Sequence, residues 1–153
     1  PLLHTIAHDI PYYRDKGIEG FYTQLSADLF HRYGLNYYLA AKLCWNPDLD
    51  AQAVLADYFE KCYGVAAAPM RRFFDRLEQA MMDWNGCSSY GLKGTTNASL
   101  APKVYTPQVM ADLQAALREA EELAGNDSVT HARVMLARKL YQELEAAVAP
   151  AGP

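Results

Sequence analysis

The sequence has little of what marks several large classes of protein. Its three cysteines, Cys44, Cys62 and Cys87, cannot all pair within one chain, and their spacings fit no zinc-binding pattern. No apolar run approaches the ~18 residues of a membrane span. Lysine and arginine total 14 against 18 aspartates and glutamates, a net charge of -4 that disfavours a nucleic-acid surface. We therefore expect no disulfide framework, no membrane partner and no nucleic-acid partner.

Strand patterns are equally scarce, because only Ile18 to Gln24 is predicted to form a short buried strand. This segment lies between two helical patterns, Thr5 to Lys16 and Tyr33 to Trp45. The order helix, strand, helix is typical of a parallel α/β sheet. A lone strand cannot satisfy its backbone hydrogen bonds. We therefore expect the chain to be the C-terminal piece of a larger α/β protein, with the partner strands upstream of Pro1.

Beyond Trp45 the chain is predicted to be helical. Asp50 and Thr106 are predicted N-caps, Pro107 fits the first position of a helix, and Gly64 and Gly125 are predicted helix ends. The predicted helices run from Asp50 to about Tyr63, Ala67 to Trp84, Thr106 to about Ala124, and Ser128 to Val148. The stretch from Asn85 to Tyr105 is predicted to be a long loop. The predicted fold class is mainly α with one strand, divided into residues 1–48 and a helical region, residues 49–150.

Four residues are predicted to contact a ligand. Tyr22 and Gln24 share one face of the predicted strand, and Gln24 at its end can hydrogen-bond a hydroxyl-rich ligand or simply the neighbouring backbone. Asp28 follows the strand and is either a site carboxylate or a solvated loop charge. His31 is a candidate acid or base without a partner near it in sequence. Glu19 lies at the wrong end of the strand for barrel chemistry, so no catalytic residue is assigned.

Two further patterns are weighed for ligand binding. His4 and His8 have the i, i+4 spacing of a helical zinc site, but Thr5 stands where a zinc protease has its glutamate, and no third ligand is evident. We expect no metal site and no cofactor. Trp84 and Tyr90 flank or lie in the long loop and are candidates for ligand contact, whereas most tyrosines are expected to pack between helices.

Three segments carry a resemblance to a known family, and the upstream stretch from Ile10 to Gln24 also resembles the helix and strand that precede them in that family. The three segments are Leu39-Ala-Ala-Lys-Leu-Cys-Trp-Asn-Pro-Asp-Leu-Asp50, Val54-Leu-Ala-Asp-Tyr-Phe-Glu-Lys-Cys-Tyr-Gly64 and Ala66-Ala-Ala-Pro-Met70. The chain resembles a large bacterial family of glycoside-hydrolase-like proteins related to alpha-glucuronidases. The resemblance implies that residues 1–48 are the C-terminal βα unit of a TIM-type barrel and that a helical domain follows. It also implies that the catalytic carboxylates are upstream and absent here. Pro11 departs from the family pattern.

Three classes of function remain open after the sequence. The first, which we favour, is the C-terminal part of a carbohydrate-active, glycoside-hydrolase-like protein. The others are a non-catalytic carbohydrate-binding module and a helical protein-interaction domain. Carbohydrate is the expected partner of the whole protein, and the predicted strand is expected to pair with the rest of its own barrel or with a second copy. A periplasmic or extracellular location follows if the resemblance holds.

Overall fold

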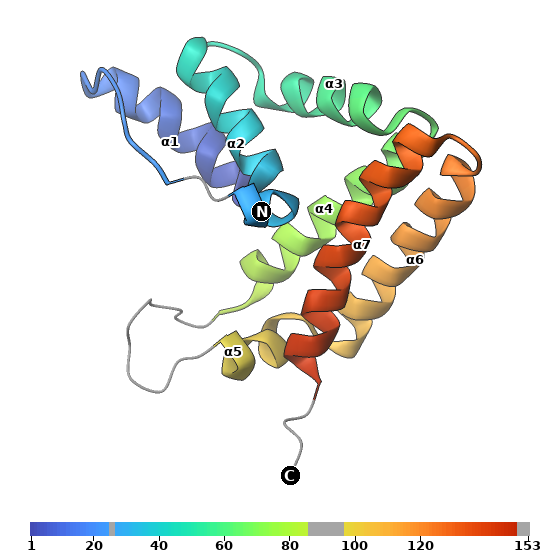
Figure 1. Cartoon of the computed structure of the whole chain (residues 1–153). Coiled ribbons are helices and arrows are strands. Elements are labelled where there is room, and N and C mark those ends of the chain that lie inside the picture. Colours follow the sequence, from blue (N-terminus) through green and yellow to red (C-terminus); the bar gives the residue numbers. More distant parts are fainter. Residues whose placement is uncertain (25–26, 86–96, 150–153) are drawn as a thin grey trace.

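The computed structural model describes residues 1–24, 27–85 and 97–149, and all regular secondary structure within them is helical (Figure 1). None of the helices in these ranges combines the length and the apolar composition needed to cross a membrane. The elements are α1 (Leu3–Asp15), η1 (Ala27–Leu29), α2 (Phe30–Trp45), α3 (Ala51–Tyr63), η2 (Gly64–Ala66), α4 (Ala67–Asp83), α5 (Asn97–Val104), α6 (Pro107–Ala124) and α7 (Ser128–Val148). The prediction of a mainly helical chain is confirmed.

Helix boundaries are confirmed where the sequence has clear capping residues. The Asp50 carboxylate accepts a hydrogen bond from the backbone N–H two residues on, at 2.9 Å, and α3 begins at the next residue. Thr106 caps α6, with Pro107 in its first position. Gly64 and Gly125 follow α3 and α6 with φ near +49°, a conformation that glycine adopts without steric cost.

Two predicted boundaries are wrong because the deciding contacts are not local. Helix α1 begins at Leu3 rather than at Thr5, and it contains Pro11. Its free backbone N–H at His4 donates instead to the carboxylate of Glu78 on α4, at 3.1 Å. The predicted loop from residue 85 to residue 105 also contains a helix, α5. Residues 86–96 of that loop lie outside the described residues.

One continuous core joins the first two helices to the rest of the chain. Helix α4 packs along α6, and α6 packs along α7, as an elongated bundle (Figure 1). Helix α2 adds a row of leucines to the same core, and α3 crosses between α2 and the bundle. The largest fully buried side chains are those of Leu39, Leu43, Leu55, Pro69, Met70, Phe73, Leu77, Leu113, Leu117 and Val134. Burial of about ten such side chains is the main source of stability.

Helices α1 and α2 lie side by side and point in the same direction (Figure 1). At one end, the backbone N–H of Leu2 donates to the Asn36 side chain at 3.0 Å. At the other end, Arg14 forms an ion pair with Asp48. Both pairs are 34 residues apart in sequence, which is the signature of a parallel register. Residues 16–29 must therefore carry the chain back along the length of α1 before α2 can begin.

The strand predicted for Ile18 to Gln24 is absent from the structure. This segment has no regular secondary structure, and every residue in it is exposed, including Ile18 at 49% and Tyr22 at 88%. A strand needs a second strand to accept and donate its backbone hydrogen bonds, and the described residues form no strand beside it. Gly17 ends the preceding helix as expected, but the pairing that would make the next segment a strand is missing from the described residues.

Two leucines on α6 test the core. Leu117 is fully buried, so Leu117→Ala should remove apolar contacts, leave a cavity and lower the free energy of unfolding by about 2–5 kcal/mol. Leu123 is 47% exposed on the same helix, and Leu123→Ala should change it by less than about 0.5 kcal/mol. Urea denaturation followed by circular dichroism measures both. Equal losses for the two variants would contradict the packing of α6.

Candidate functional site

Three of the predicted ligand-contacting residues lie on the exposed segment before α2. Tyr22 and Asp28 have exposed side chains, and Asp28 lies in η1. The backbone carbonyl of Gln24 accepts a hydrogen bond from the Tyr37 hydroxyl at 2.6 Å, which holds the end of the segment against α2. In the described ranges, no hydrogen bond or ion pair joins the side chains of Tyr22, Gln24 and Asp28 to one another.

The fourth predicted residue, His31, lies in a different environment. Its side chain is 4% exposed, and its Nε2 lies 2.8 Å and 2.9 Å from the two carboxylate oxygens of Glu143 on α7. The Nε of Arg32 donates to the same carboxylate at 2.7 Å. We call these three residues the His31–Glu143–Arg32 cluster. It fixes the start of α2 to the second half of α7, so His31 has the partner that the local sequence does not reveal.

The electrostatics of the cluster favour an ionised Glu143. Partial burial raises the pKa of this carboxyl, but the hydrogen bonds and charges of Arg32 and His31 outweigh burial. The net result is a pKa below the ordinary value of 4.5. The Glu143 carboxylate therefore stays charged at pH values above its lowered pKa, and in this charged form it holds α2 and α7 together.

A second histidine–carboxylate contact joins α1 to α4. Glu78 is buried to 12% side-chain exposure and accepts hydrogen bonds from both the backbone N–H and the Nδ1 of His4, at 3.1 Å and 2.9 Å. His8 lies beside Asp9 instead. No group of three side chains able to hold a metal ion occurs in the described part of the chain. Of the two histidines with i, i+4 spacing, His4 therefore contacts α4 and His8 lies at the surface.

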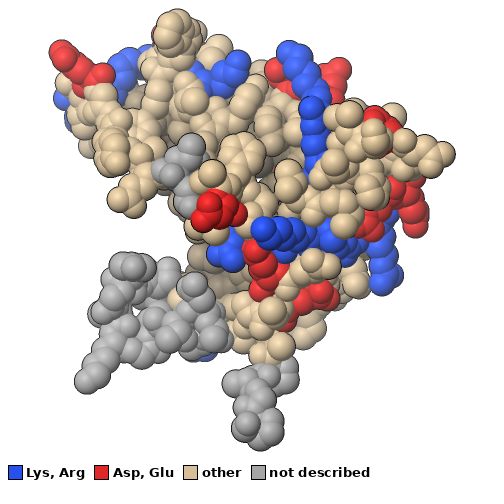
Figure 2. Space-filling view, in the orientation of Figure 1, with Lys and Arg blue, Asp and Glu red and all other residues tan. Residues whose placement is uncertain are grey.

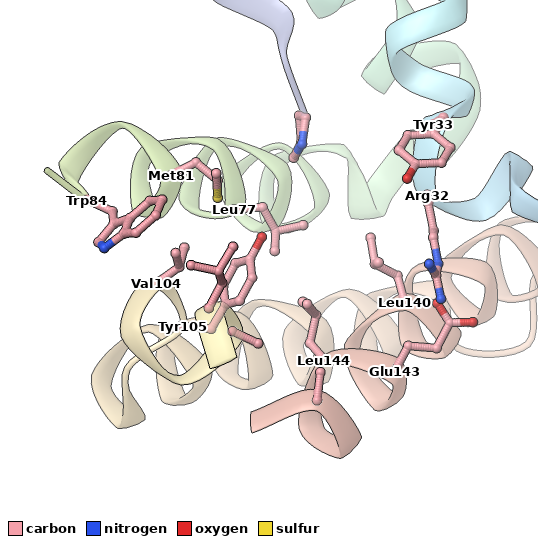
Figure 3. A pocket seen from close by; sticks show the side chains of 14 residues that line it. Arg32, Tyr33, Leu77, Met81, Trp84, Val104, Tyr105, Leu140, Glu143 and Leu144 are labelled. Carbon is pink, nitrogen blue, oxygen red and sulfur yellow. The ribbon is translucent and has the colours of Figure 1, made fainter. Parts of the chain in front are cut away.

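A pocket of about 410 Å³ lies beside the His31–Glu143–Arg32 cluster (Figure 3). It is enclosed by the start of α2, the end of α4, α5 and the second half of α7. Its walls are mostly apolar, and Trp84, Tyr105 and Tyr33 supply three aromatic rings. Arg32 and Glu143 provide the charged edge, and Figure 3 shows them together at one end with Trp84 at the other. This size and composition fit a small-molecule site.

The hydroxyl of Tyr105 is directed into this pocket (Figure 3). Burial raises the pKa of Tyr105 above its ordinary value. Among the described residues, none hydrogen-bonds to this hydroxyl. A half-buried tyrosine hydroxyl usually has a hydrogen-bond partner. A ligand or a water molecule in the pocket can supply that partner for Tyr105.

The sequence indicates only one of the residues that line this pocket. Trp84 is a candidate for ligand contact from its position beside the polar stretch, and it lines the pocket, whereas Tyr90 lies outside the described residues. Arg32, Tyr105 and Glu143 were not singled out. Arg32 and Glu143 are 111 residues apart, so only the packing of α2 on α7 brings them together.

Outside the pocket, charges of both signs are interspersed over the helical bundle (Figure 2). Arg72 pairs with Glu119, Arg76 with Asp112, and Arg138 with Glu121, each linking different helices. The exposed pair of Arg72 and Glu119 contributes little individually. Because positive and negative groups alternate, this face presents no extended basic surface to a polyanion.

The cluster predicts a pH-dependent contribution to stability. Glu143→Gln should lower the free energy of unfolding at pH 7 by roughly 1 kcal/mol, because a charged acceptor of two hydrogen bonds is replaced by a neutral one. Since the folded-state pKa of Glu143 lies below 4.5, the difference from the wild type should persist above pH 4.5 and shrink as the pH falls further. Glu119→Gln, at an exposed ion pair, is the control. A difference that grows below pH 4.5 would contradict the assignment.

Comparison with known proteins is informative for the first half of the chain only. No curated protein and no solved structure matches the sequence. Residues 1–75, which extend from the start of the chain into α4, match the model of the family described as Domain of unknown function (DUF4838).

Proposed function

We propose that residues 1–48 are the last βα unit of a TIM-type barrel and that residues 49–150 are a helical region attached to it. The whole protein is then carbohydrate-active and glycoside-hydrolase-like, with its catalytic carboxylates upstream of Pro1. The observation that carries the barrel unit is the parallel arrangement of α1 and α2. The match of residues 1–75 to one family model is consistent with a unit that continues through α3.

The geometry of the returning segment agrees with a barrel strand. In a βα barrel, successive helices are parallel because each strand runs back between them. The 13 residues of α1 span about 20 Å at ~1.5 Å per residue. The seven residues from Ile18 to Gln24 span about 23 Å at ~3.3 Å per residue when extended. A strand of this length therefore returns the chain from the end of α1 to the start of α2.

The distribution of exposed apolar side chains supports the same proposal. Of the seventeen large hydrophobic side chains that are exposed in the described residues, ten lie in the first 49 residues. Three of them, Ile18, Phe21 and Tyr22, belong to the returning segment. An exposed apolar cluster of this kind marks a surface that another part of a protein covers. In a barrel, the neighbouring strands provide that cover and pair with the segment's backbone.

The carbohydrate assignment is supported by the resemblance and by the position of the predicted ligand contacts. In TIM barrels the active site is built at the C-terminal ends of the strands. Gln24 ends the predicted strand and Asp28 follows it, so both would border that face, whereas a pair of carboxylates flanking a glycosidic bond must come from strands outside this chain. Residues 1–153 alone are then a supporting part of the site rather than a complete catalyst.

Hydrogen exchange of the returning segment tests the barrel unit. The amides of residues 19–24 should exchange rapidly in the 153-residue chain and become strongly protected in a longer protein that includes the upstream strands, because only there do they gain hydrogen-bond partners. The amide of Ile18 is left out of the test because it already donates to the Tyr13 carbonyl at 3.0 Å. Amides at the centre of α6 should be protected in both and serve as the control. Protection of residues 19–24 in the 153-residue chain would show that the segment needs no further strands.

Turnover of an aryl glycoside or glucuronide separates the classes of function. The 153-residue chain should show none, and the longer protein should show turnover. Activity of the 153-residue chain that is abolished by Asp28→Asn or Glu19→Gln would contradict the proposal. Glycan binding by the longer protein without turnover would instead identify a non-catalytic carbohydrate-binding protein.

A further inference from the structure

We propose that the pocket between α2, α4, α5 and α7 binds a single sugar ring. This inference rests on the proposed function and assigns the helical region a direct part in it. The pocket's volume of about 410 Å³ suits a small ligand rather than a segment of a polymer or the surface of a partner protein. Its two kinds of wall, one apolar and aromatic and one charged, decide the chemistry of that ligand.

The apolar wall of the pocket suits the face of a pyranose ring that exposes C–H groups. Trp84 lies at one end of the pocket, and Leu77, Val104 and Leu144 line its middle (Figure 3). Aromatic rings offer a large rigid surface together with a polar tip that can remain wet. A wholly apolar ligand would leave the charged end of the pocket unused, and a small inorganic ion would leave most of the apolar wall in water.

The polar groups converge on the edge of the same space. The Tyr105 hydroxyl faces the pocket without a partner among the described residues, and it can both donate and accept a hydrogen bond. Arg32 binds Glu143 through Nε, and its other two guanidinium nitrogens form no hydrogen bond with a described residue. Glu143 keeps acceptor capacity beyond the two hydrogen bonds that it receives. Hydroxyls around a sugar ring can use all three groups.

The pocket also lies at one end of the proposed barrel unit, and this is the end at which a substrate would bind. Arg32 and Tyr33 are in the first turn of α2, a few residues beyond Gln24 and Asp28. In the proposed barrel, the start of α2 is at the C-terminal end of the last strand, which is the catalytic face. A sugar ring held by the helical region would thus be beside that face and not on the opposite side of the barrel.

The chain's two tryptophans allow a direct binding measurement. Trp45 is 91% exposed at the far end of α2, and Trp84 lines the pocket, so Trp45→Phe leaves Trp84 as the sole tryptophan. Titration of this variant of the 153-residue chain with glucose, galactose and glucuronic acid should change Trp84 fluorescence saturably for at least one sugar. A stronger response to glucuronic acid than to the neutral sugars would identify the acidic sugar as the ligand and Arg32 as its partner.

Tyr105→Phe, made in the same background, tests the assigned contact. It removes only the hydroxyl and should weaken sugar binding about three- to tenfold, the effect of losing one hydrogen bond. Tyr12→Phe, at an exposed tyrosine of α1, should leave the affinity unchanged. An unaltered affinity in Tyr105→Phe, or no saturable response to any of the three sugars, would overturn the pocket assignment.

The outcome is distinguishable from failure of the proposed function. If the longer protein turns over a glycoside or glucuronide while the 153-residue chain binds none of the sugars, the pocket proposal is wrong and the proposed function stands. If the 153-residue chain binds a sugar through Tyr105 while the longer protein shows neither turnover nor glycan binding at its barrel, the proposed function is wrong and the pocket is an independent sugar site.

Discussion

Two consecutive helices that point the same way must be joined by a segment that travels back along them. This constraint, set by the contacts of Leu2 with Asn36 and of Arg14 with Asp48, determines the first third of the molecule. It excludes a short turn between α1 and α2, and residues 18–24 of the connection are exposed. Helix α2 meanwhile commits Leu35, Leu39 and Leu43 to the core that it shares with the later helices.

The helical part of the fold was predictable because its signals are local. Asp50, Thr106 and Asp127 cap helices through their own neighbouring N–H groups, and Gly125 ends α6 by a backbone conformation that few other residues adopt. The start of α1 was not predictable, because its cap is Glu78, supplied by another helix. The prediction of a strand was wrong for a different reason. Its local pattern is present, but a strand requires partner strands that the described residues do not contain.

The candidate site could be predicted only in fragments. Trp84 was found because it ends a strong amphipathic helix next to a polar stretch. His31 was found, but as a free acid or base, whereas its buried ring is engaged by Glu143. Arg32 on α2, Glu143 on α7 and Tyr105 in the connection between α5 and α6 are brought together by packing that no local pattern specifies. Side chains that lie more than 100 residues apart leave no local pattern in a single sequence from which their contact can be predicted.

The contacts that hold the two parts of the chain together also shape the pocket. His4 with Glu78 and His31 with Glu143 both join the first 48 residues to later helices, and the second contact positions Arg32 at the edge of the pocket. Ligand sites are common where two structural units meet, because each unit supplies one wall. Here α2 supplies Arg32 and α7 supplies Glu143 at the charged edge, while α4, α5 and α7 supply most of the apolar wall. The half-buried hydroxyl of Tyr105 is directed into this space, where water or a bound molecule can serve as its hydrogen-bond partner.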